Sequence, residues 1–132
     1  PEVVQAAVVN SPVTDYRFYD TAYSERFLGL PEQDPAAYDR AAVLTYAGRL
    51  QGDLLLYYGT SDDNVHPKNA LQLIKALQAA GKSFEVQVGP DRGHTGVDQL
   101  RMMEFFIERL VLDRRDTPPA AGTSPPRQDQ AE

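Results

Sequence analysis

The apolar and polar positions of the chain alternate between strand-like and helix-like segments. Residues 3–9 form an apolar, largely β-branched run broken only by Gln5, which predicts a strand buried on both faces. The apolar run over 53–58 predicts a second strand. The alternating apolar residues of 83–88 predict a third strand.

Helical periodicity lies between and after these strands. The clearest helix is predicted over 67–80, with Pro67 in its first turn and Gly81 as its stop. Its apolar face is expected to comprise Leu71, Ile74 and Leu77. A second long helix is predicted over 97–112, with an inner side made of the apolar residues Leu100, Met103, Phe106, Ile107 and Leu110.

The segment between the first two predicted strands is expected to contain shorter helices. Tyr19, Tyr23 and Phe27 recur at helical spacing. Asp34 is placed to cap a short helix over 35–39, and another short helix is expected over 43–50.

The order of these elements predicts an α/β fold, with a mostly parallel sheet flanked by helices. Residues 1–112 are expected to form the domain. The Pro-rich residues 113–132 cannot supply a packed core and are predicted to be a disordered tail.

Composition narrows the possible functions. A length of 132 residues fits one domain or part of one. The net charge of −6 argues against binding nucleic acid and against docking on anionic lipid. The absence of cysteine excludes a disulfide framework and a thiolate metal site, and no apolar run is long enough to span a membrane.

Two residues that follow predicted strands carry candidate chemistry. Asp62 follows the second strand, and His94 follows the third in a loop that contains three glycines. Asp before His is the order found in the second half of an α/β-hydrolase triad, yet no Gly-x-Ser-x-Gly motif occurs in the chain. The simpler alternatives are an aspartate that caps a turn, which Asp63 would also suit, and an ordinary loop histidine. His66 is interpreted as local structure, and the two histidines lack the spacing of metal ligands.

Two longer stretches resemble a known family. Residues 11–31 resemble the segment that follows the nucleophile in the prolyl oligopeptidase family, and the nearest branch is dipeptidyl peptidase IV-like. Residues 59–66 resemble the acid loop of that branch, and the separation of Asp62 and His94, 94 − 62 = 32 positions, fits it. The likeness covers about residues 3–112. It implies the C-terminal portion of an α/β-hydrolase domain.

The resemblance also implies roles for individual residues. Asp62 would be the triad acid and His94 the general base, while Asn64 would bind a carbonyl of the substrate backbone. The pocket for the residue before the scissile bond, typically proline or alanine, would be lined by Val13, Tyr16, Tyr19, Tyr23 and Val65. Two positions depart from the family pattern: Tyr16 replaces a frequent tryptophan, and Tyr58 stands where histidine is common.

The expected enzyme is a serine peptidase that needs no metal or other cofactor and acts on peptides. Its nucleophile and a β-propeller would belong to the remainder of the same protein, so this chain alone is expected to be inactive. The resemblance favours a periplasmic or secreted location and leaves a homodimer open. Two alternatives stay open: a non-catalytic α/β binding module, and an acylaminoacyl peptidase or esterase with the same triad.

Overall fold

The computed structural model describes residues 3–112. In chain order the elements are β1 (Ala6–Asn10), η1 (Tyr16–Phe18), α1 (Thr21–Leu28), α2 (Pro35–Ala41), η2 (Val43–Arg49), β2 (Asp53–Gly59), α3 (Lys68–Ala79), β3 (Glu85–Gly89), α4 (Gln99–Ile107) and η3 (Glu108–Leu112). The predicted tail over 113–132 lies outside the described residues.

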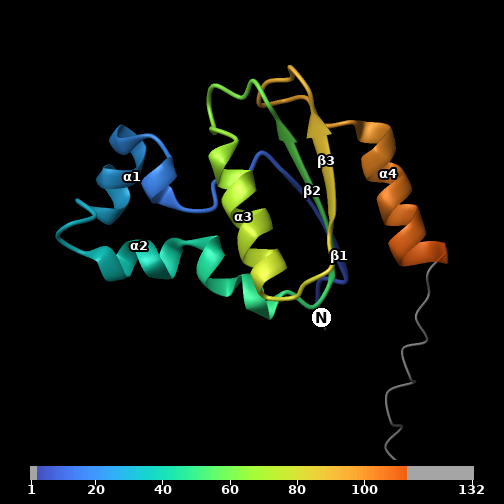
Figure 1. The fold of residues 1–132 in the computed structure, drawn as a ribbon, viewed down its shortest axis with the longest axis horizontal. Helices are drawn as coiled ribbons and strands as arrows, with labels where there is room; N and C mark the ends of the chain where they lie inside the picture. The colour runs from blue at the N-terminus through green and yellow to red at the C-terminus, as the bar shows by residue number, and fades with distance from the viewer. Residues whose placement is uncertain (1–2, 113–132) are drawn as a thin grey trace, which may run out of the picture.

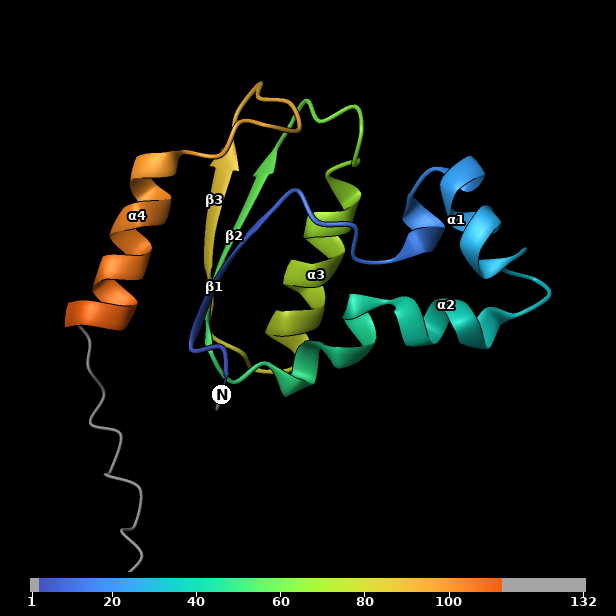
Figure 2. The same cartoon turned by 180° about the vertical axis from the view of Figure 1, so that it is seen from behind.

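The three strands form one parallel sheet in the order β1-β2-β3. Val8 pairs with Leu55 across the first strand pair, and Leu56 pairs with Val86 across the second. Figures 1 and 2 show α3 on one face of this sheet and α4 on the other, with α1 and α2 forming an arm beyond α3. The predicted α/β fold with a parallel sheet between helices is confirmed.

The main core lies between the sheet and α3. It contains Leu54 and Leu56 of β2, packed against the α3 residues Ala70, Leu73 and Leu77. The predicted face of this helix is wrong at Leu71, which is 50% exposed. The contact stripe follows positions 70, 73 and 77, and the next residue along a helix points about 100° away from the one before it.

Four of the five residues predicted for the inner side of the last helix are exposed, and the fifth, Phe106, is half-buried. Leu100 is 70% exposed, and Met103, Ile107 and Leu110 are exposed as well, whereas Phe105 is fully buried. The face toward the sheet is instead formed by residues 101, 105 and 109, because β3 presents the carboxylate of Glu85 to it. The guanidinium groups of Arg101 and Arg109 both pair with that carboxylate.

The two outer strands are less buried than the sequence predicts. β1 begins at Ala6, with Val3 exposed before it, and its residues are half-buried or exposed. Val86 and Val88 of β3 are likewise exposed. Both strands lie at edges of the described sheet, so only β2 has a neighbour on each side.

Asp34 caps a short helix between β1 and β2, as the sequence predicts. The carboxylate of Asp34 accepts a hydrogen bond from the Ala37 N–H at 3.0 Å and so caps α2. Tyr23 and Phe27 lie on α1, but Tyr19 precedes that helix, because Asp20 caps it.

Candidate active site

The candidate site lies where the parallel strands end. Asp62 and Asn64 belong to the loop after β2, and His94 belongs to the loop after β3. The segment with Tyr16 and Tyr19 follows β1. The carboxyl ends of parallel strands meet at one edge of a sheet, which brings these segments together.

Asp62 is held by both of its carboxylate oxygens. Oδ1 accepts hydrogen bonds from the N–H groups of Asn64 at 3.0 Å and Val65 at 2.9 Å. Oδ2 lies 3.0 Å from Nδ1 of His94. One oxygen therefore closes the local turn that a lone aspartate would make, and the other is left to meet the histidine.

The surroundings of Asp62 keep it ionised. Its side chain is almost completely buried, and burial by itself would raise its pKa. The hydrogen bonds from the Val65 N–H, the His94 ring and the Asn64 N–H outweigh that effect and hold the pKa below the ordinary value of an aspartate. A carboxylate can only accept, so Nδ1 of His94 must carry the proton. In the neutral imidazole, Nε2 then has a lone pair with which to accept a proton.

Backbone hydrogen bonds hold the loop that carries His94, residues 90–98 and here called the histidine loop, against the acid loop. The N–H of Ser61 donates to the Arg92 carbonyl at 3.0 Å, and the N–H of Thr60 donates to the Gly89 carbonyl at 3.0 Å. Gly59 lies directly beneath, where an added Cβ would sit 2.2 Å from the Arg92 oxygen. The close approach of the two loops therefore requires glycine at position 59.

Ser11 supports the histidine loop from β1. Its hydroxyl donates to the main-chain carbonyl of His94 at 3.2 Å, and the Asn10 amide lies 3.5 Å from the same oxygen. The hydroxyl contacts the backbone of His94, and a side-chain hydrogen bond from Ser11 also helps to lower the pKa of Asp62, so Ser11 supports both candidate residues. Ser11 lies in the turn after β1, where its φ of 41° is in the left-handed region.

The predicted pocket tyrosines form one aromatic cluster. The ring of Tyr23 stacks on Tyr16 at a centroid distance of 6.4 Å and meets the edge of Tyr19 at 5.7 Å. The Tyr19 hydroxyl donates to Oδ1 of Asn64 at 3.4 Å. The cluster of Tyr16, Tyr19 and Tyr23 thus contacts the acid loop through Asn64. That contact uses the amide oxygen of Asn64 and leaves its Nδ2 group able to donate to another acceptor.

A hollow of about 240 Å³ opens beside this cluster. Tyr16 and Tyr23 line it, together with Ser24, Phe27, Leu28 and Ala41. The other predicted pocket residues lie outside its lining: Val13 and Tyr19 are half-buried after β1, and Val65 is buried within the acid loop.

The second histidine has a local role. Nδ1 of His66 accepts a hydrogen bond from the Lys68 N–H at 3.1 Å, next to the first residue of α3. Within residues 3–112, no group of three or more His, Cys, Asp or Glu side chains could hold a metal ion. In the same described range, no helix is both long and apolar enough to cross a bilayer.

Sequence reasoning missed Asn69, which is fully buried and linked to the segment before the tyrosines. An asparagine in the first turn of a helix is an ordinary capping residue, so the sequence carries no signal of these contacts.

Known proteins with similar sequences are dipeptidyl-aminopeptidases. A probable dipeptidyl-aminopeptidase B of Talaromyces marneffei is 41% identical over 96 residues, which are 71% of this chain and 11% of that protein. A probable dipeptidyl-aminopeptidase B of Metarhizium robertsii is 43% identical over 107 residues, covering 79% of this chain and 11% of that protein. The chain therefore spans about a tenth of the length of these curated relatives.

Solved structures with the same fold point in the same direction. Dipeptidyl peptidase 4 of Porphyromonas gingivalis superposes with a TM-score of 0.77 at 33% identity, over 80% of this chain and 16% of that chain. A putative dipeptidyl aminopeptidase IV of Bacteroides ovatus superposes with a TM-score of 0.78 at 26% identity, over 83% of this chain and 16% of that chain.

The family profile covers nearly the whole described chain. Residues 1–111 match the profile of the prolyl oligopeptidase family. This match agrees with the resemblance of residues 11–31 and 59–66, and with the α/β-hydrolase domains of the structural neighbours. The chain belongs to the prolyl oligopeptidase family.

Proposed function

We propose that this chain supplies the acid and the base of the catalytic triad of a dipeptidyl peptidase-like serine peptidase. The observation that carries the proposal is the 3.0 Å contact between Asp62 Oδ2 and His94 Nδ1, made by a carboxylate that two backbone N–H groups keep ionised. The nucleophilic serine belongs to the part of the full-length protein outside this chain. The proposal includes that remainder, with a β-propeller, as the partner of this chain, and a periplasmic or secreted location.

The proposed chemistry follows from the proton positions. Asp62 holds His94 with its proton on Nδ1, and Nε2 accepts the proton of the attacking serine hydroxyl. The positive charge that then forms on the imidazole is offset by the Asp62 carboxylate. The same Nε2 proton is donated to the leaving amine, which completes the acylation step.

The aromatic cluster is proposed to set the specificity. Tyr16 and Tyr23, which line the hollow, would wall an apolar pocket for a proline or alanine side chain. Tyr19, Val13 and Val65 lie outside that lining and would complete the wall when a substrate is bound in the full-length protein. Asn64 would donate from Nδ2 to a substrate carbonyl, since its Oδ1 already accepts from Tyr19. The names of the relatives support release of dipeptides, because they are called dipeptidyl-aminopeptidases.

The test is hydrolysis of matched substrates by the full-length protein. Dipeptide p-nitroanilides that end in proline, with a free and with a blocked amino terminus, are compared with a simple ester. Cleavage only of the free-amino substrate is expected. Preference for the blocked substrate or for the ester would indicate an acylaminoacyl peptidase or an esterase with the same triad, and no cleavage at all would indicate a binding module.

A further inference from the structure

Asn69 is a fully buried polar side chain in the first turn of α3. Its Oδ1 accepts hydrogen bonds from the Thr14 N–H at 3.0 Å and from the Thr14 hydroxyl at 3.3 Å. Its Nδ2 donates to the Phe18 carbonyl at 3.2 Å. One side chain thus forms hydrogen bonds with both ends of the five-residue segment 14–18, which contains Tyr16 and directly precedes Tyr19.

The same residue also binds the acid loop. Nδ2 of Asn69 donates to the His66 carbonyl at 3.3 Å, and the backbone N–H of Asn69 donates to that carbonyl at 3.0 Å. The single proton of the Thr14 hydroxyl is shared between the Asn69 carbonyl at 2.8 Å and Oδ1 at 3.3 Å, and the shorter contact is the main one. Both amide donors and the amide oxygen of Asn69 are therefore satisfied, and they connect the tyrosine-bearing segment with the loop of Asp62.

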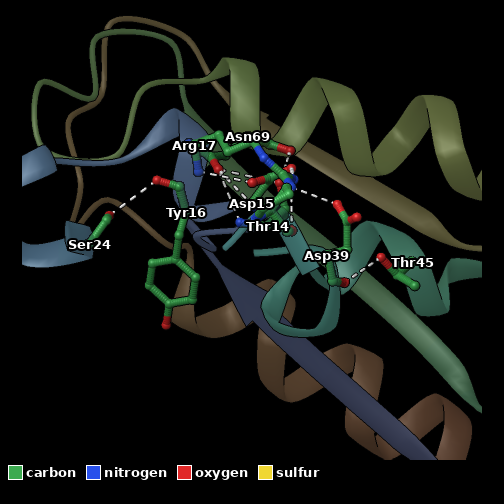
Figure 3. Close-up of polar contacts among 9 residues, drawn as sticks. Thr14, Asp15, Tyr16, Arg17, Ser24, Asp39, Thr45 and Asn69 are labelled. Carbon is green, nitrogen blue, oxygen red and sulfur yellow. Dashed lines mark hydrogen bonds and ion pairs between the residues drawn. The ribbon is translucent and has the colours of Figure 1, made fainter. Parts of the chain in front are cut away.

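An ion-pair network braces the other side of segment 14–18. Figure 3 shows Arg17 between Asp15 and Asp39, to which its guanidinium donates at 3.1 Å and 2.6 Å. The Ser24 hydroxyl donates to the Tyr16 carbonyl at 3.1 Å, as the same view shows. These outer contacts are exposed or part-buried, whereas those of Asn69 with Thr14 are buried, so Asn69 is the stronger of the two anchors.

We propose that Asn69 is a positioning residue for substrate specificity, an inference that rests on the proposed function. It acts through its neighbours: it fixes Tyr16 and Tyr19 relative to the acid loop that carries Asn64. A buried asparagine whose role was only to cap α3 would bind within that helix. The side-chain amide of Asn69 instead forms hydrogen bonds with Thr14, Phe18 and His66, which all lie on the two segments that form the candidate pocket.

The experiment uses the full-length protein with Asn69→Asp and Thr14→Val. Asn69→Asp keeps the acceptor and removes both Nδ2 donors, while Thr14→Val keeps the shape and removes only the hydroxyl bonds. Tyr46→Phe is the matched control, because it too removes only a hydroxyl: the Tyr46 hydroxyl donates to the Arg40 carbonyl at 3.0 Å, which is not among the contacts of segment 14–18. The measurement is kcat/KM for dipeptide p-nitroanilides that end in proline or in glycine, alongside the melting temperature.

A positioning role predicts a change in selectivity. The proline-to-glycine ratio should fall about 2- to 10-fold in Thr14→Val, the size expected for a lost hydrogen bond, and should stay at the wild-type value in Tyr46→Phe. Thr14→Val decides the matter if Asn69→Asp does not fold. A lower melting temperature with an unchanged ratio would overturn the inference and make Asn69 a purely structural residue. A wild-type enzyme that releases nothing after proline would instead overturn the proposed function, and this inference with it.

Discussion

The contact between Asp62 and His94 depends on how closely the histidine loop lies on Gly59, and Gly59→Ala tests that dependence. An alanine Cβ would sit 2.2 Å from the Arg92 oxygen and 2.5 Å from the Gly93 oxygen. Non-bonded carbon and oxygen atoms normally keep roughly 3.3 Å apart, so the backbone of the loop must move by about 1 Å. Both close atoms are main-chain carbonyls, and no side-chain rotation can relieve them.

This displacement should lower turnover in a protein that still folds. The loop residue Arg92 precedes His94 by two positions and accepts the hydrogen bond from Ser61. A shift of about 1 Å lengthens the Asp62–His94 contact beyond hydrogen-bond range, and misplacement of this size lowers turnover about 10²-fold. Overpacking of this kind costs about 1–3 kcal/mol of folding free energy.

The assay measures kcat and the melting temperature of the full-length protein as wild type, as Gly59→Ala and as the control variant Gly48→Ala. The added Cβ at position 48 would meet only the Ala80 Cβ at 3.9 Å, which is an ordinary contact, so that variant should match wild type. A folded Gly59→Ala enzyme that keeps turnover within about twofold of wild type would refute the reasoning, because the energetic scale of misplacement predicts a much larger loss.

Three further predictions concern the triad, the pocket and the sheet. In the full-length protein, Asp62→Asn should lower turnover about 10⁴-fold, because an amide can donate to Nδ1 and favour the wrong tautomer; near-normal turnover would remove Asp62 from the triad. Tyr23→Ala should lower kcat/KM after proline several-fold, and an unchanged value would remove Tyr23 from the pocket. The pKa of Glu85 lies below its ordinary value because hydrogen bonds from Arg109 and Arg101 lower it, and together they outweigh burial, which would raise it. It should therefore stabilise the fold above about pH 4.3 and lose that effect at lower pH, so the melting temperatures of wild type and Glu85→Gln should converge on acidification. A gap that stays constant down to pH 3 would argue against the ion pairs.

The sequence predicts the elements of this fold better than their faces. β2 and α3 occur within one residue of their predicted bounds, because a continuous apolar run and a helix between Pro67 and Gly81 are strong local signals. The face that α4 and η3 turn to the sheet was not predictable in the same way. Periodicity assumes that apolar residues turn inward, yet Arg101 and Arg109 face the sheet to meet Glu85, whose place on β3 depends on strand register.

The candidate site shows the same division. Asp62 and His94 stand out because each follows a strand in a recognisable motif. Ser11 and Asn69 do not, since their partners lie 83 and 55 positions away in the chain. Contacts of that range depend on how β1, α3 and the histidine loop pack, and no local pattern records them.

Labelling of the full-length protein with a fluorophosphonate, in wild type and in His94→Gln, decides whether the Asp62–His94 pair activates a serine. The proposed triad predicts that wild type is labelled on one serine outside this chain, and that His94→Gln slows the labelling by orders of magnitude. A wild-type protein that resists the probe, or a His94→Gln variant labelled as fast as wild type, would contradict it.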